Sequence, residues 1–110
     1  MSRAAGSVVP GTLDMLVLKT LALEPMHGFG VAQRIEQGSR AVFRVNPGSL
    51  FAAFRRLERA GLVRGEWRTT ENGRRARYYA LSERGRKRLD RETEDWERQT
   101  AAISRILGLA

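Results

Sequence analysis

Arginine is the most frequent residue of this chain that can bind a charged or polar partner, and most of its arginines lie in the middle of the sequence. Between residues 34 and 91 there are sixteen Lys and Arg against six Asp and Glu, whereas the two flanking segments carry no net positive charge. Guanidinium groups bind phosphates and guanine edges through paired hydrogen bonds. The net charge of +8 on 110 residues therefore predicts a polyanionic partner, most often nucleic acid. A solvated, arginine-rich surface is the alternative explanation.

Catalytic and metal chemistry have few candidate residues in this sequence. The chain contains one histidine and no cysteine, which removes disulfides, thiolate metal sites and cysteine nucleophiles. His27 lies in a glycine-rich turn, where we expect it to cap a helix or to fill the turn. The sequence has no phosphate-binding loop and no metal-ligand spacing. We therefore predict no enzyme activity, no catalytic or metal site and no cofactor.

The best-marked helix of the sequence begins after Asn46 and ends before Gly61. Asn46 is a typical N-cap, Pro47 suits the first helical position and Gly61 is a typical C-terminal stop. One face is an apolar stripe of Leu50, Ala53, Phe54 and Leu57. The other face combines small residues, which allow close approach of a partner, with arginines that reach further. We predict that it contacts DNA through Pro47, Gly48, Ser49, Phe51, Ala52, Arg55, Arg56 and Arg59. An ordinary surface helix with a solvated basic face is the alternative.

A basic β-hairpin is expected after this helix. Residues 62–69 and 75–81 have strand character, and Asn72-Gly73 between them predicts a two-residue type I′ turn. Tyr79 and Leu81 are expected to face the core, whereas Tyr78 suits either side. Arginines crowded on a small hairpin repel one another, and a polyanion relieves that repulsion. The candidate DNA contacts of the hairpin are Arg68, Asn72, Gly73, Arg74, Arg75 and Arg77.

The order of the expected elements defines a fold class. A helix capped by Thr12 ends before Pro25, and a short amphipathic helix spans His27 to Gln37. Three helices followed by a two-stranded wing form a winged helix-turn-helix, a mainly helical α+β fold whose third helix enters the DNA major groove. We therefore divide the chain into a flexible tail (1–10), a DNA-binding domain (11–81) and a C-terminal dimerisation helix (82–110).

The C-terminal helix carries a seam with heptad spacing. Ser82 is its expected N-cap, and the helix should extend to about Leu107. The seam residues recur at intervals of four and three, which is typical of a helix that packs against a partner helix. We predict a homodimer interface made of Leu89, Thr93, Trp96, Thr100, Ile103 and Leu107, with Leu13 and Leu16 of the first helix. Packing of the last helix onto residues 13–23 of the same chain, or onto a different protein, are the alternatives.

Several short motifs occur together in a familiar order. They are Met26-His27-Gly28-Phe29-Gly30-Val31, Pro47-Gly48-Ser49-Leu50-Phe51, Arg56-Leu57-Glu58, Arg74-Arg75-Ala76-Arg77-Tyr78-Tyr79 and Leu81-Ser82-Glu83-Arg84-Gly85. Over residues 11 to 107 the chain resembles the PadR family of transcriptional regulators, in its short subfamily with a single C-terminal helix. This sequence has Phe51-Ala52 where the family usually has Tyr-Pro, so no hydroxyl is available there for a phosphate.

The resemblance implies a dimeric repressor of a pseudo-palindromic operator, released by a small molecule or another signal. It also makes Trp96 a candidate effector site for a small aromatic compound, because drug-responsive members bind their ligands against aromatic residues of this helix. Plain packing of Trp96 is the alternative.

An RNA-binding basic module is the alternative function, although we expect no exposed aromatic platform for stacking single-stranded bases. The most apolar stretch, 16–23, is too short to span a bilayer, and residues 1–10 lack a signal-peptide core, so we expect a cytoplasmic protein without a membrane partner.

Overall fold

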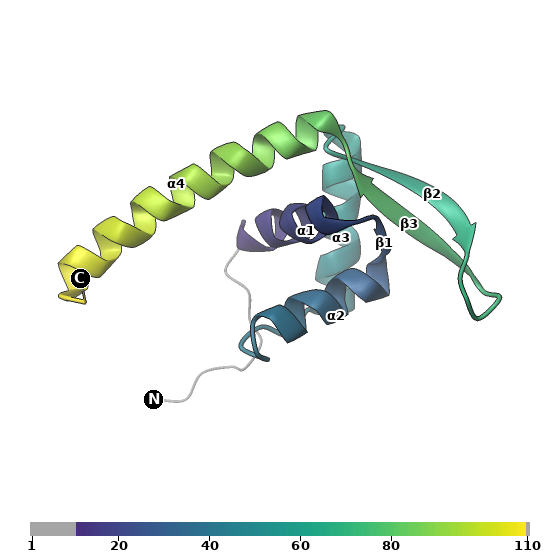
Figure 1. The fold of residues 1–110 in the computed structure, drawn as a ribbon, viewed down its shortest axis with the longest axis horizontal. Helices are drawn as coiled ribbons and strands as arrows, with labels where there is room; N and C mark the ends of the chain where they lie inside the picture. The colour runs from purple at the N-terminus through teal and green to yellow at the C-terminus, as the bar shows by residue number, and fades with distance from the viewer. Residues whose placement is uncertain (1–10, 110) are drawn as a thin grey trace.

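The computed structural model describes residues 11–109 and consists of helices around a small sheet (Figure 1). The predicted flexible tail, 1–10, lies outside the described residues. The elements in order are α1 (Thr12–Leu23), β1 (Met26–His27), α2 (Gly28–Gly38), α3 (Pro47–Arg59), β2 (Val63–Thr69), β3 (Arg75–Leu81) and α4 (Glu83–Leu107). The predicted mainly helical α+β fold, with three helices, a β wing and a long C-terminal helix, is confirmed.

The helix ends follow the capping residues of the sequence in most cases. The Asn46 side chain accepts a hydrogen bond from the Ser49 N–H (3.1 Å), and the Ser82 hydroxyl accepts one from the Gly85 N–H (3.0 Å), as predicted. The expected N-cap of α1 is wrong by one residue. Gly11 occupies that position without a side-chain cap, and Thr12 is the first helical residue.

The sheet has three strands in the order β1-β3-β2 rather than the two that were predicted. The additional strand, β1, pairs antiparallel with β3 through Met26 opposite Tyr79 and His27 opposite Tyr78. A two-residue strand is too short to show the alternating pattern by which strands are recognised in a sequence. The sheet therefore ties the start of α2 to the base of the wing.

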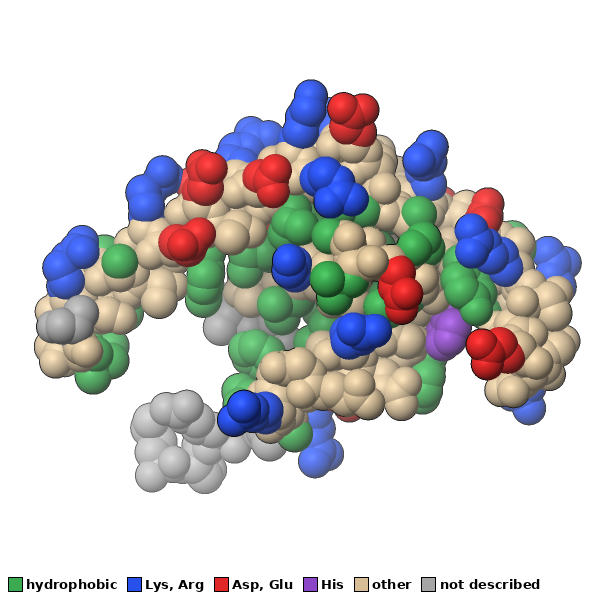
Figure 2. All heavy atoms as spheres, in the orientation of Figure 1, with side chains coloured by type: hydrophobic (Ala, Val, Ile, Leu, Met, Phe, Trp, Pro, Cys, Tyr) green, Lys and Arg blue, Asp and Glu red, His purple; other side chains and the backbone are tan. Residues whose placement is uncertain are grey.

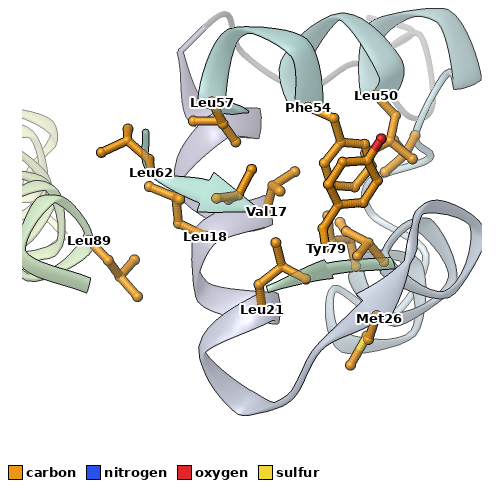
Figure 3. Close-up of a cluster of buried hydrophobic side chains, with 14 residues drawn as sticks. Val17, Leu18, Leu21, Met26, Leu50, Phe54, Leu57, Leu62, Tyr79 and Leu89 are labelled. Atoms are coloured by element: carbon orange, nitrogen blue, oxygen red, sulfur yellow. The ribbon is translucent and has the colours of Figure 1, made fainter. Parts of the chain in front are cut away.

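The core forms where α1, α3 and the sheet pack against one another. Val17 and Leu18 are completely buried there. The rings of Phe54 in α3 and Tyr79 in β3 stack with centroids 3.9 Å apart and planes 3° apart, as Figure 3 shows. Leu89, from the start of α4, completes this cluster on the far side of α1. The buried stripe of α3 is the predicted one: Leu50, Ala53, Phe54 and Leu57.

The long helix α4 packs against α1 only through its first turns. Beyond them it leaves the body of the molecule on the side opposite to the wing (Figure 1). Its 25 residues span roughly 38 Å at the usual rise. In Figure 2 charged side chains of both signs line its outer edge, and hydrophobic side chains gather beneath it. No helix within residues 11–109 is both long enough and apolar enough to cross a membrane.

The start of α4 leaves no room for a side chain at Gly85. A Cβ added there would lie 2.1 Å from the Leu62 carbonyl oxygen and 2.7 Å from Cδ1 of Leu81. The Leu62 carbonyl is held in place because it accepts the Ser82 N–H at 3.0 Å. The backbone of α4 at Gly85 therefore lies directly against the backbone of Leu62, the residue before β2.

We predict that Gly85→Ala lowers the free energy of unfolding by about 3 kcal/mol or more, because the added methyl group forces two fixed backbones apart. Urea unfolding followed by circular dichroism measures this loss. Gly38→Ala is the matched control, since a Cβ at Gly38 would have no other atom within 4 Å. Equal stability of the two variants would contradict the packing described for Gly85.

Candidate nucleic-acid interface

The outer face of α3 is exposed along its length. Gly48, Ser49, Arg55 and Arg59 are exposed and Ala52 is half-buried, all on the side away from the core. Neither Arg55 nor Arg59 makes an ion pair with any described residue. The predicted face thus keeps two free positive charges one helical turn apart, behind an N-terminal turn made of small residues.

Arg56 is the one predicted arginine of α3 that lies toward another helix. Its Nη2 donates to Oδ1 of Asp14 in α1 at 2.8 Å. This hydrogen bond, with the negative charge of Asp14, raises the pKa of Arg56 above its ordinary value. Arg56 therefore links α3 to α1, and part of its charge is engaged inside the protein.

The tip of the wing presents arginines on a tight loop. The Gly73 N–H donates to the Thr70 carbonyl (2.9 Å), and the Thr70 N–H donates to the Arg74 carbonyl (2.6 Å). Gly73 has φ of 78°, but Asn72 is not among the described residues with positive φ. The predicted type I′ turn needs positive φ at both positions and is wrong. The pattern is that of a three-residue loop, whose last residue is left-handed and therefore favours glycine. Arg74 and Arg75 follow this loop directly and are exposed.

The remaining wing arginines have partners within the sheet. Arg68 pairs with Glu66 at 2.5 Å, and its guanidinium lies 5.3 Å from the centre of the Tyr78 ring. Arg75 lies over the ring of Trp67 at 5.6 Å. These contacts hold the long side chains of Arg68 and Arg75 against the strands. Fewer side-chain conformations are therefore lost when a partner binds them.

Arg77 turns from the wing toward α3. Its Nη2 donates to Oε2 of Glu58 at 2.6 Å, with both side chains about one-third exposed. A Cβ at Gly65 in β2 would lie 2.7 Å from Nε of Arg77, so glycine makes room for the guanidinium. Glu58 was named in the sequence only as part of the motif Arg56-Leu57-Glu58, without a role of its own. A single glycine inside a strand often marks a place where another group approaches the backbone closely. Gly65 could have indicated such a place in the sequence, but it does not show that Arg77 fills it or that Glu58 pairs with Arg77.

His27 caps α2, as predicted. Its Nδ1 accepts the Gly30 N–H at 3.0 Å, and its ring meets Tyr78 edge-on with centroids 5.5 Å apart. Both contacts explain the histidine as a structural residue.

Three aromatic side chains are exposed on the DNA-binding part of the chain. Phe29, Phe51 and Trp67 are all more than half exposed. They lie on α2, α3 and β2, and the guanidinium groups of Arg75 and Arg77 lie over the Trp67 ring. The rings therefore do not share one sheet face as a stacking platform would require.

The predicted dimer residues divide into a covered and an uncovered group. Leu89 is buried in the core of its own chain, and Leu13 and Leu16 are half-buried against the same cluster. Trp96 is 47% exposed and Ile103 is 55% exposed. The uncovered group within the described residues is Thr93, Trp96, Thr100, Ile103 and Leu107. The seam thus begins in the core and continues along the free part of α4.

A hollow of about 630 Å³ opens between α1 and α4. Leu16 and Lys19 line it from α1, and Leu89, Thr93 and Trp96 line it from α4. Asp90 and Glu94 lie at the same hollow, so it combines an apolar floor with charges of both signs.

This arrangement of three helices and a wing defines a winged helix-turn-helix protein. The model of the PadR-like transcriptional regulator family matches residues 17–91, so this chain belongs to that family. Its members regulate transcription and are not enzymes.

Solved structures and a curated protein are similar to this chain. A PadR family transcriptional regulator from Eggerthella lenta is similar at a TM-score of 0.77 and 26% identity, over 91% of this chain and 85% of that one. A transcriptional regulator from Clostridium thermocellum shares the fold at a TM-score of 0.79 and 24% identity, over 86% of this chain and 92% of that one. An uncharacterized 37.1 kDa protein in transposon Tn4556 of Streptomyces fradiae is 39% identical over 90 residues, which are 82% of this chain but 24% of that protein. This chain thus spans about a quarter of that relative.

Tyr79 provides a test of the packing between the wing and α3. Burial raises the pKa of its phenol above the ordinary value of 10.0, and the positive charge of Arg77 opposes that rise. Because folding favours the neutral phenol, its contribution to stability is complete below the unfolded pKa and is lost as the pH rises through the folded pKa. We predict that the free energy of unfolding falls above about pH 10 and falls less in Tyr79→Phe.

Urea titrations across this pH range measure the slope. Tyr78→Phe is the control and should keep the fall of the wild type. Parallel curves for the wild type and Tyr79→Phe would show that the phenol is not buried as described.

Proposed function

We propose that this chain is a cytoplasmic, sequence-specific regulator that binds double-stranded DNA with α3 in the major groove. The observation that carries the proposal is the outer face of α3, where Arg55 and Arg59 are exposed without an ion pair to any described residue. Arginine in the major groove makes paired hydrogen bonds to guanine. Gly48, Ser49 and Ala52 let the first turns of the helix approach the base edges closely.

The wing supplies phosphate contacts in this proposal. Arg74 and Arg75 follow the loop at the tip of the wing, and Asn72 and Gly73 lie within that loop. A guanidinium has five N–H donors, so Arg56, Arg68 and Arg77 retain donors for phosphate while pairing with their carboxylates. We assign these arginines to positioning contacts, which fix the protein on DNA without carrying sequence information.

A homodimer follows from the uncovered part of α4. Trp96, Ile103 and Leu107 are exposed at heptad spacing, and a second copy of the same helix would bury them. Leu13 and Leu16 border this surface from α1. Two copies related by a two-fold axis place two α3 helices on a pseudo-palindromic operator, where occupancy would repress transcription.

Release by an effector is the last part of the proposal. The hollow between α1 and α4 has Trp96 on one wall, and a planar aromatic compound would stack on that ring. Because the hollow borders the dimer surface, a bound compound would change the angle between the subunits and the spacing of their α3 helices. A small aromatic effector therefore suits both the shape and the position of the hollow.

Arg55 and Arg74 are expected to respond differently to replacement. Arg55→Ala should weaken binding to a selected operator duplex by about 1–3 kcal/mol, with a smaller effect on random duplex, because it removes a base contact. Arg74→Ala should weaken both duplexes similarly and reduce the salt slope by about 1, because it removes a phosphate contact. Fluorescence anisotropy at several salt concentrations measures both effects.

Single-stranded RNA at equal salt is the comparison arm of that experiment. Tighter binding to RNA than to any duplex would favour the RNA-binding alternative. Absence of salt-sensitive binding to every duplex would overturn the proposal.

The dimer is tested by Trp96→Arg. A charge at the centre of the apolar surface should convert a dimer into a monomer in sedimentation experiments, and operator affinity should fall with it, because the two half-sites must be held together. Ala101→Arg is the matched control, since Ala101 is exposed on α4 outside the seam. Equal dimerisation of the two variants would exclude this part of α4 as the interface.

A further inference from the structure

Phe51 is an apolar residue on the polar side of α3. It is 52% exposed, whereas the four residues of the apolar stripe of α3 are buried. It lies one helical turn before Arg55, on the same side of the helix. The exposed part of this ring is therefore available to a partner of α3.

The ring is held in a defined place. A Cβ at Gly28 would lie 3.7 Å from Cε1 of Phe51 and 3.2 Å from Cε2 of Phe54, so the start of α2 packs directly beside it. A hollow of about 280 Å³ lies between α2 and the start of α3, and Phe29, Val45, Pro47, Leu50 and Phe51 line it. Phe29 is 75% exposed at its rim. The exposed edge of Phe51 is therefore part of a fixed apolar surface beside the proposed reading face.

Few side chains at this end of the helix can hydrogen-bond to a base. Ser49 carries one hydroxyl, Gly48 and Ala52 carry no hydrogen-bonding side chain, and Arg55 is one turn further along. Each base pair presents donors and acceptors in the major groove, but the only apolar group there is the C5-methyl of thymine, and phenylalanine is one of the side chains that contact it. An apolar surface at the first turns of α3 therefore matches one feature of DNA.

We propose that Phe51 is a specificity-determining residue that recognises the methyl group of a thymine in each half-site. This inference rests on the proposed function, because it assumes that α3 enters the major groove. In this view Phe51 selects an A·T pair at one position of each half-site. Arg55 and Arg59 make the contacts to guanine or phosphate. Phenylalanine in place of the family's usual tyrosine at position 51 would then change which DNA sequence is preferred, in addition to removing a hydroxyl that could bind phosphate.

The test uses the full chain and duplexes selected from a random pool by repeated rounds of binding. Each thymine of the selected site is replaced, one at a time, by deoxyuridine, which lacks only the methyl group. At one position in each half-site we expect binding of the wild type to weaken about fourfold, the equivalent of one buried methylene-sized group. Phe51→Ala should bind the thymine duplex more weakly than the wild type and should not respond to deoxyuridine at that position.

Two further variants complete the test. Phe51→Leu should keep part of the methyl preference, because an apolar side chain remains. Val42→Ala removes an exposed apolar side chain outside the hollow and should keep the full response of the wild type. Melting curves confirm that the variants are folded.

The outcomes separate the inference from the proposed function. Selected duplexes that bind well but show no deoxyuridine effect, or an equal effect in the wild type and Phe51→Ala, would overturn the role of Phe51 alone. Failure to select any duplex would overturn the proposed function and this inference with it. A position-specific loss that disappears in Phe51→Ala would establish the methyl contact.

Discussion

Burial of α1 is the constraint on which the rest of the structure depends. This helix is apolar on nearly every side, and α2, α3, β3 and α4 all pack against it. Val17 and Leu18 are completely enclosed as a result. Because one helix supplies the contact surface for every other helix, their relative positions are fixed together. The outer face of α3, the wing and the free part of α4 are the surfaces left over once this burial is satisfied.

The arginines divide into two groups according to whether the fold supplies an acid. Arg56 meets Asp14 and Arg77 meets Glu58, and both pairs connect elements that are distant in the sequence. Exposed pairs of this kind add little stability, but they fix the direction of long side chains. Arg55 and Arg59 lie on the same helix without such a partner among the described residues. The net charge of +8 already counts each acid against a basic residue, so these pairs decide where on the surface positive charge is available and do not change its sum.

The sequence predicted elements wherever the local chain carried its own signal. Caps such as Asn46 and Ser82, the stripe of α3 and the strands of the wing depend on neighbouring residues, and they were found within about two residues. The strand β1 and the pair Arg77–Glu58 depend on segments that meet only after folding, and no local pattern reveals them. Leu89 fits a heptad seam and a core position equally well, because both need an apolar side chain at that spacing. The wing loop was placed correctly but given the wrong turn type, since Asn-Gly suits more than one hairpin geometry.

The junction between the wing and α4 has a mechanical consequence. β3 ends at Leu81 and α4 begins at Glu83, so Ser82 alone joins them. Its hydroxyl donates to the Gly61 carbonyl at 2.7 Å, and its N–H donates to the Leu62 carbonyl at 3.0 Å. The joint therefore contains no flexible linker, and a tilt of α4 would be passed to the base of the wing instead of being taken up between them.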